Sequence, residues 1–177
     1  MTIVQHSSQS SDWFTPARYA EAAREVMGDI DLDPASCVEA NAAIGARKFF
    51  TPEDDGLAQP WHGRVFLNPP YGRTTLNGVV RSSVEVWTHK LRHEFSIGNV
   101  SEAILLVNAT PAQRWFQALW QWPICFPNHR IRFWRVDSVN KAPTHSNCFV
   151  AIGYRADLPN DFIRHFSEFG PIVRRVG

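Results

Sequence analysis

The sequence predicts an α/β protein built as one domain around a mixed sheet. Short apolar segments typical of buried strands alternate with helical segments in the earlier part of the chain. The later apolar segments have the pattern of antiparallel strands, which favours a mixed edge on an otherwise parallel sheet. A chain of 177 residues can bury one sizeable core and is too short for two ordinary domains.

The first residues predict a tail and not a folded element. Residues 1–12 are polar, rich in Ser and Gln and without hydrophobic periodicity, so we expect them to be disordered and not a signal peptide. No apolar run approaches the length of a membrane span. We expect a single domain over 13–177, with no repeat and no linker, and a protein that needs no membrane and no obligate protein partner.

A helix and a strand are expected next. Thr15 followed by Pro16 is a helix-start signal, and apolar residues at helical spacing predict a helix over 16–27 that a glycine ends. Acidic and aliphatic residues alternate over 29–33, which predicts a strand that ends at Pro34.

The middle of the chain continues the alternation. Weak helical character over 38–46 is followed by a short apolar piece at 47–50, expected to be extended, and by a turn-rich segment at 51–56. The clearest buried strand is 65–67, and a helix is expected over about 76–92.

The last part of the chain is dominated by strands. A helix is expected to begin at Thr110-Pro111. Strands are expected at 102–107, 124–126, 130–134 and 147–154.

Charge and cysteine usage narrow the function classes. The net charge of +1 does not by itself indicate a nucleic-acid partner. The charges are unevenly distributed, however, with acidic residues concentrated in the first third of the chain and basic residues later. An acidic first third suits a ligand with an ammonium group, and the basic remainder suits a polyanion. The three cysteines are far apart and lack metal-ligand spacing, so we expect reduced thiols, a cytoplasmic protein, and neither a disulfide nor a metal site.

The most informative feature is the predicted strand at 65–67 that ends abruptly in Asn68-Pro69-Pro70-Tyr71. Ligands in open α/β sheets bind outside the carboxyl ends of the strands. The Asn68 side-chain oxygen and the rigid Pro69 carbonyl can accept the two hydrogens of an exocyclic amine and so activate its nitrogen. Tyr71 offers a face on which an extruded base can stack. The alternative is a rigid loop with no chemistry.

The chain also resembles a known family. The strings SDWFTP, DIDLDPAS, KFFTPEDDGLAQPWHGRVFLNPPYG, ILLVNATPAQRWF and RIRFW, in this order, are similar to the phage-type Dam family of DNA N6-adenine methyltransferases over most of 11–135. The resemblance implies a Rossmann-like methyltransferase fold with helices on both faces of a mixed, mostly parallel sheet of about seven strands. It implies methyl transfer from S-adenosyl-L-methionine to adenine N6 in double-stranded DNA, with Asn68, Pro69, Pro70 and Tyr71 as the catalytic tetrad.

Candidate cofactor residues follow from the acidic strand end. Asp33-Pro34 resembles the motif that holds the cofactor, where a carboxylate pairs with the methionine ammonium, and Asp31 is a second candidate. Both carboxylates can also be read as solvated strand residues. No glycine-rich loop follows Asp33, because Ala35-Ser36-Cys37 stands in its place.

Other cofactor candidates lie on either side of that strand. Thr15 and Pro16 resemble the segment that meets the cofactor's carboxylate in related enzymes, although they are also an ordinary helix start. Asp55 is a candidate for binding the cofactor's adenine amino group, although its turn would select Asp in any case. Trp13 is a weaker candidate for stacking on the cofactor.

Candidate DNA contacts are the basic residues beside the predicted site, Arg73, Arg130 and Arg132. The chain segments 72–100 and 128–146 are the sizeable candidates for target recognition. Methylation of cytosine N4 stays open, since the same acceptors activate any exocyclic amine, and so does a non-catalytic DNA-binding module with this fold. A cytosine C5 enzyme is not expected, because no cysteine has the required Pro-Cys setting.

Overall fold

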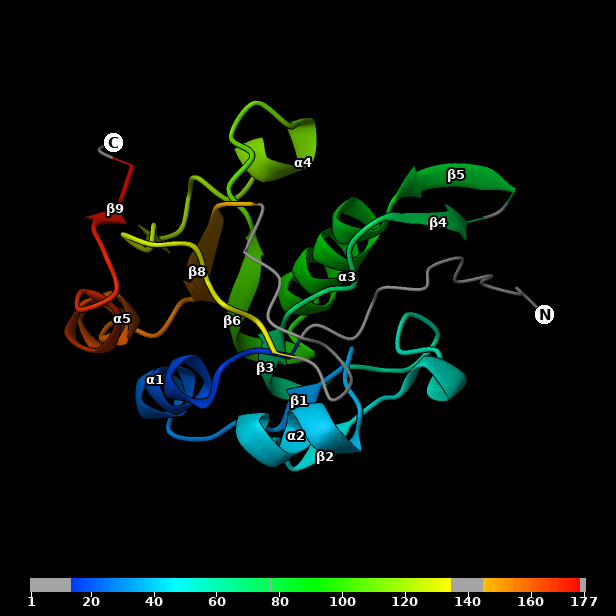
Figure 1. The fold of residues 1–177 in the computed structure, drawn as a ribbon, viewed down its shortest axis with the longest axis horizontal. Coiled ribbons are helices and arrows are strands. Elements are labelled where there is room, and N and C mark those ends of the chain that lie inside the picture. Colours follow the sequence, from blue (N-terminus) through cyan, green and yellow to red (C-terminus); the bar gives the residue numbers. More distant parts are fainter. Residues whose placement is uncertain (1–13, 77, 135–144, 176–177) are drawn as a thin grey trace.

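The computed structural model describes residues 14–76, 78–134 and 145–175. Its main sheet has seven strands: β1 (Leu32–Asp33), β2 (Lys48–Phe49), β3 (Gly63–Leu67), β6 (Val100–Asn108), β7 (Ile124–Cys125), β8 (Asn147–Gly153) and β9 (Ile172–Val173). A separate hairpin consists of β4 (Arg73–Leu76) and β5 (Val79–Ser82) (Figure 1). The tail expected at 1–12, and Trp13, lie outside the described residues.

The sheet has the order β2-β1-β3-β6-β8-β7-β9. The neighbouring strands β2, β1, β3 and β6 are parallel, and the pairs from β6 to β9 are antiparallel. From β1 the chain moves to β2 on one side and then returns to β3 on the other. This reversal opens a crevice at the carboxyl ends of β1 and β3, where ligands bind in sheets of this kind.

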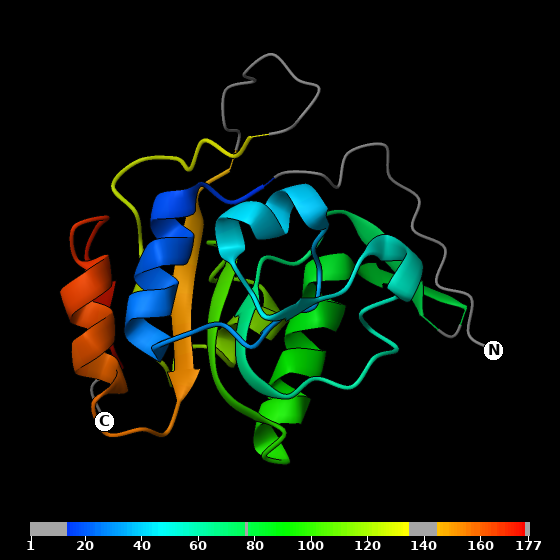
Figure 2. The same ribbon diagram turned by 90° about the horizontal axis from the view of Figure 1, so that it is seen from below.

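Helices cover both faces of the sheet. Figure 2 shows α1 (Ala17–Met27) and α5 (Leu158–Phe166) on one side and α3 (Ser83–Ser96) on the other. The shorter helices are α2 (Val38–Ile44), η1 (Pro52–Asp54, a 3-10 helix) and α4 (Arg114–Gln117). The Rossmann-like α/β fold expected from the sequence is therefore confirmed.

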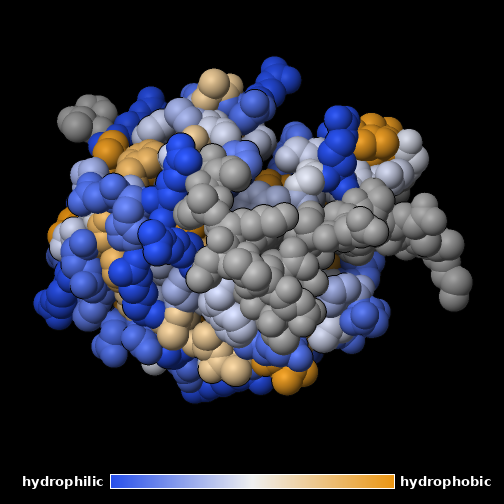
Figure 3. Space-filling model, in the orientation of Figure 1, coloured by the Kyte–Doolittle hydropathy of each residue, from blue (hydrophilic) through white to orange (hydrophobic). Residues whose placement is uncertain are grey.

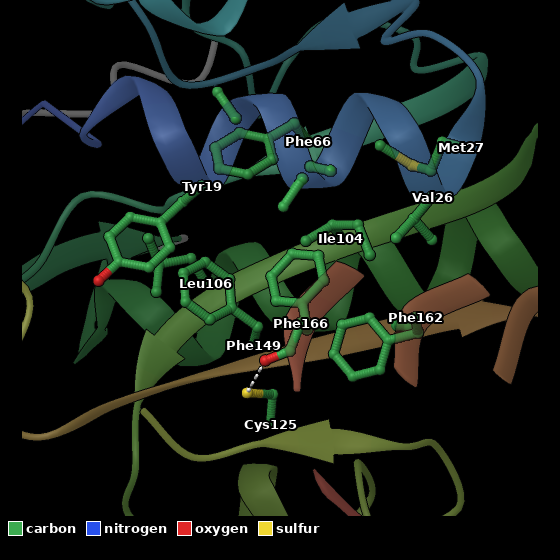
Figure 4. Close-up of a cluster of buried hydrophobic side chains, with 14 of the residues drawn as sticks. Tyr19, Val26, Met27, Phe66, Ile104, Leu106, Cys125, Phe149, Phe162 and Phe166 are labelled. Carbon is green, nitrogen blue, oxygen red and sulfur yellow. Dashed lines mark hydrogen bonds between the residues drawn. The ribbon is translucent and has the colours of Figure 1, made fainter. Parts of the chain in front are cut away.

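The strands feed two hydrophobic cores because successive side chains point to opposite faces. On β6, Ile104 and Leu106 pack with α1 and α5, whereas Leu105 packs with the α3 side of the sheet. Figure 4 shows the first core, on the face of the sheet that α1 and α5 both cover. There Tyr19 and Val26 of α1 pack in one cluster with Phe162 and Phe166 of α5. Sheet and helices are thus fixed by packing on both faces, which leaves the strand ends to carry the site.

Two sequence expectations were wrong. The helix expected over 76–92 begins only at Ser83, and the residues before it form the β4–β5 hairpin, whose turn includes Gly78 at a φ of 76°. Glycine adopts this left-handed conformation without steric cost. The strand expected at 130–134 is reduced to a bridge between Trp134 and Phe14, because no strand lies beside the rest of it.

Other differences concern the ends of elements. The strand expected over 29–33 is restricted to Leu32–Asp33, and the helix expected from Thr110 is the short α4. Two elements, α5 and β9, had not been expected. They complete the sheet edge and the core on the α1 side.

Candidate active site

The candidate site is a cavity at the carboxyl ends of β1 and β3. These strands are parallel neighbours, so Asp33 at the end of β1 and Asn68 just after β3 reach the same edge of the sheet. Both residues line the cavity. Its walls include Phe14, Thr15, residues 33–37, 50–52, 55–56 and 68–71, Arg73, and Ser83 and Trp87 of α3.

Asn68 is held by Thr15. Its Nδ2 donates to Thr15 Oγ1 at 3.2 Å, and Thr15 is 3% exposed. The helix-start reading of Thr15 was wrong in detail, because the N-cap of α1 is Pro16 and no side chain caps it. Pro16 is half-buried and does not line the cavity. The Thr15 contact uses the donor end of the Asn68 amide.

Tyr71 is anchored through its hydroxyl. Asn147, at the start of β8, donates from Nδ2 to Tyr71 Oη at 3.3 Å and to Asn108 Oδ1 at 3.1 Å. Asn108 and Asn147 are paired residues of β6 and β8. Burial raises the pKa of Tyr71, so the phenol stays neutral. Sequence reasoning missed Asn147, which lies 76 positions from Tyr71.

Asp33 is a buried carboxylate. Only 4% of its surface is exposed, and its Oδ1 accepts a hydrogen bond from the Ala35 N–H at 3.2 Å. Burial raises the pKa of Asp33 from 3.8 to about 6. A solvated strand-end carboxylate is therefore not what the structure shows. Among the described residues, no Lys, Arg or His forms an ion pair with Asp33. The charged form of this buried carboxylate would therefore favour a cationic ligand.

The turn that carries Asp55 is held against the end of β1. Trp61 Nε1 donates to Gly56 O at 2.7 Å, and a Cβ on Gly56 would lie 2.0 Å from Pro34 O. Only glycine permits this approach. Asp55 has a φ of 51°, and its Oδ1 is buried with no hydrogen-bond partner among the described residues. A buried acceptor of this kind is stabilised by a donor from a bound ligand.

Asp54, its neighbour, has a different role. Its Oδ2 accepts from Thr51 N at 2.8 Å and from Thr51 Oγ1 at 2.9 Å. The hydrogen bond from the Thr51 backbone lowers the pKa of Asp54. Asp54 thus fixes the turn, and Asp55 is the carboxylate of the pair that lines the cavity.

Asp31 is not brought into the cavity. Arg64 donates to it from Nε and Nη2 at 2.8 and 2.9 Å, and the Arg64 N–H adds a third bond at 2.9 Å. The Arg64 hydrogen bond holds the pKa of Asp31 at about 2. Arg47 lies 3.5 Å away. These contacts give Asp31, just before β1, a structural role in binding Arg64 of β3, and we leave Asp31 out of the proposed site.

The three arginines fall into two groups. Arg73 lines the cavity at the start of the hairpin. Arg130 and Arg132 are exposed and do not line it. Their segment reaches the cavity wall indirectly, since Trp134 exchanges backbone hydrogen bonds with Phe14 at 2.8 and 3.2 Å.

Several cavity residues escaped sequence reasoning. Phe50 and Phe14 add aromatic surface, Ser36 lies beside Asp33, and Trp87 Nε1 is buried with no hydrogen-bond partner among the described residues. Phe50 had a usable signal, because it ends the apolar piece just before the turn. The others did not, since a serine after a strand or a tryptophan on a helix is ordinary.

The cavity therefore combines two carboxylates, aromatic walls, free polar atoms and the Asn68–Tyr71 loop. This set suits a ligand with a cationic group and several donors, placed beside a base that approaches Asn68. Within 14–76, 78–134 and 145–175, no cluster of His, Cys, Asp or Glu is arranged to hold a metal ion. Over the same ranges, no helix has the length and apolar character to cross a membrane.

Comparison with known proteins gave one finding. A family model described as DNA N-6-adenine-methyltransferase (Dam) matches residues 4–158. No curated protein and no solved structure matched significantly.

Proposed function

Because the chain belongs to the Dam family of DNA N-6-adenine-methyltransferases, we propose that it transfers the methyl group of S-adenosyl-L-methionine to the N6 amino group of adenine in double-stranded DNA. One observation carries the proposal. Asn68-Pro69-Pro70-Tyr71 follows β3 into a cavity whose neighbouring wall holds the buried carboxylate of Asp33 and the buried Oδ1 of Asp55.

The residues present fit this cofactor. Asp33 would pair with its ammonium, and Asp55 would accept from its adenine amino group through the buried Oδ1. Thr15 Oγ1 accepts from Asn68, so the Thr15 hydroxyl hydrogen is left to donate to the cofactor's carboxylate. Pro34 and Phe50 supply apolar surface. When bound, the cofactor supplies an electrophilic methyl group.

The chain's own residues would activate the target base. Asn68 Oδ1 and the Pro69 carbonyl accept the two hydrogens of the amine, which makes its lone pair more available. Tyr71 holds the ring of the extruded adenine by stacking, and the Asn147 contact keeps Tyr71 in place.

Attack by the amine itself needs no covalent enzyme intermediate. Cys37 lines the cavity, but burial raises the pKa of its thiol, and its Sγ accepts from Ala40 N at 3.4 Å. Cys125 and Cys148 are buried in the core. A cysteine nucleophile is therefore not part of the proposal.

Incubation of unmethylated DNA with the protein and labelled S-adenosyl-L-methionine tests the function directly. Nucleoside analysis should give N6-methyladenine. N4-methylcytosine would show the alternative amine specificity, and no labelled nucleoside would indicate a module that binds without catalysis.

Asn68→Ala tests the catalytic assignment. Loss of the acceptor should lower the methylation rate about a hundredfold or more, because the contact strengthens in the transition state. Affinity for S-adenosylhomocysteine should change little. Asn160→Ala, at an exposed position on α5, is the matched control and should keep full activity. Activity of Asn68→Ala within tenfold of the unmodified protein would exclude the assignment.

A further inference from the structure

The β4–β5 hairpin begins at Arg73, two residues after Tyr71, and leaves the body of the protein (Figure 1). It forms its own two-stranded sheet, with no third strand beside it among the described residues. Ser83 N donates to Gly72 O at 3.0 Å, which closes the base of the hairpin next to the Asn68–Tyr71 loop. The hairpin is thus fixed at the mouth of the cavity and unpartnered along its length.

The hairpin exposes apolar side chains. Val79 and Val80 are 52% and 51% exposed, and all four residues of β5 are exposed. Figure 3 shows an apolar area over the end of the hairpin with hydrophilic side chains beside it. Two adjacent exposed valines, on a hairpin with no third strand beside it among the described residues, are typical of a surface that another molecule covers.

Charge indicates which molecule that is. No Asp or Glu occurs from Gly56 to Val84, while Arg73 and Arg81 lie on the two strands of the hairpin. Arg73 shares one face with Val80, and Arg81 shares the other with Val79, as the register of the two strands requires. Each face therefore combines a cation near the base with a valine near the tip.

These features match duplex DNA in size as well as charge. The major groove, about 12 Å wide, admits a two-stranded β-ribbon. Strands of four residues extend about 13 Å at 3.3 Å per residue, which is the length over which the hairpin could contact the groove. Arginines bind phosphates, and apolar side chains pack against base edges and thymine methyl groups.

We propose that the β4–β5 hairpin enters the major groove beside the extruded adenine, with Arg73 and Arg81 on flanking phosphates and Val79 and Val80 against the neighbouring base pairs. This inference rests on the proposed function, because it needs DNA at the cavity. Apolar contacts beside the vacated position would offset part of the unstacking cost.

The test compares duplex and single-stranded binding. A fluorescein-labelled duplex of unmethylated DNA and one of its separated strands are titrated by anisotropy with S-adenosylhomocysteine present. Val79→Thr combined with Val80→Thr keeps shape and strand propensity. It should weaken duplex binding about tenfold and single-strand binding much less. Val173→Thr, at an exposed valine on β9, should change neither.

Arg81→Gln separates the charge contribution. It should weaken duplex binding and reduce the salt dependence by about one phosphate contact, whereas the valine variant leaves the salt dependence unchanged. Arg164→Gln, at an exposed position on α5, is its control. Unchanged affinity for S-adenosylhomocysteine verifies that each variant is folded.

Equal weakening on duplex and single strand, or no weakening, would overturn the inference. A change in sedimentation of the free protein upon the valine substitutions would assign the hairpin to a second copy of the chain and also overturn it. Failure of the proposed function is distinguishable, since the unmodified protein would then methylate no DNA in the nucleoside assay.

Discussion

Two aspartates on either side of Leu32 show how much one position changes the chemistry of a carboxylate. Asp31 bonds to Arg64, and its pKa is held at about 2; Asp33 is buried at the cavity, and its pKa is raised to about 6. The alternating pattern of the sequence does not distinguish the two aspartates, because both flank Leu32 just ahead of Pro34. Their tertiary partners decide that one is structural and the other faces the cavity.

Stability against pH should therefore respond in opposite directions to Asp31→Asn and Asp33→Asn. A depressed pKa means that Asp31 stabilises the fold above pH 3.8, and this contribution is lost as pH falls toward 2. A raised pKa means that the contribution of Asp33 is fully present below pH 3.8 and is lost as pH rises through 6. At pH 7 we expect Asp31→Asn to cost about 1 to 2 kcal/mol and Asp33→Asn to stabilise the ligand-free protein by a similar amount.

Denaturant unfolding at pH 7 and pH 5 measures the Asp33 effect, and a further measurement at about pH 3 detects the loss of the Asp31 contribution. Calorimetric titration with S-adenosylhomocysteine adds the functional readout. The unmodified protein should lose affinity below about pH 6 as Asp33 takes up a proton. Asp33→Asn should bind more weakly, with little pH dependence, and Asp31→Asn should bind normally. If Asp33→Asn binds as tightly as the unmodified protein at pH 7, Asp33 does not pair with the ammonium.

Tyr71 is expected to act through its ring, with the hydroxyl serving to position it. Tyr71→Phe removes the acceptor for Asn147 and should cost about 1 kcal/mol of stability, with the methylation rate within about tenfold. Tyr71→Ala should weaken base binding and rate much more, because stacking is lost. Asn147→Ala combined with Tyr71→Phe should cost less than the sum of the single changes. A Phe variant as inactive as the Ala variant would give the hydroxyl a direct catalytic role.

At the scale of elements, the sequence predicted correctly those strands, helices and turns that are determined by neighbouring residues in the chain. The buried strand before Asn68, the helix after Thr15 and the turn at 51–56 could be predicted because apolar period, proline position and turn residues specify them. The hairpin was missed although Asn77-Gly78, between Thr74-Thr75 and Val79-Val80, is a sequence typical of a two-residue turn. The predicted helix was extended toward the N-terminus from α3, so that it wrongly covered residues 76–82.

Elements that form only by pairing with a distant strand were harder to predict from the sequence. Residues 130–134 alternate as a strand does, yet only Trp134 finds a partner, at Phe14. Strand β9 is two residues long and exists through its pairing with β7. In the same way the loop at 68–71 and Asp33 were expected at the site from their residue types, their strand-end positions and the family resemblance, whereas Asn147 reaches Tyr71 only because β8 pairs with β6.

At the scale of the whole molecule, the cavity belongs to one half of the chain. Its walls come from residues 14–87, whereas β6 to β9 and α5 complete the sheet and the cores. The site is therefore built from loops held at one end of a sheet whose stability comes from packing elsewhere. Loops of this kind open locally more easily than core strands do.

Cofactor binding should accordingly protect the cavity loops more than the remainder of the fold. In hydrogen exchange with S-adenosylhomocysteine, we expect slower exchange in peptides covering 33–37, 50–56 and 68–73, because a ligand that bridges them must dissociate before they open. The exchange rate of peptides from α5 should change little. If these peptides exchange only by global unfolding, their protection should rise together with the ligand-dependent increase in Tm. Asp33→Ala at the same ligand concentration should show less protection in all three loops. Protection confined to regions outside 14–87 would place the cofactor elsewhere and remove this cavity as its site.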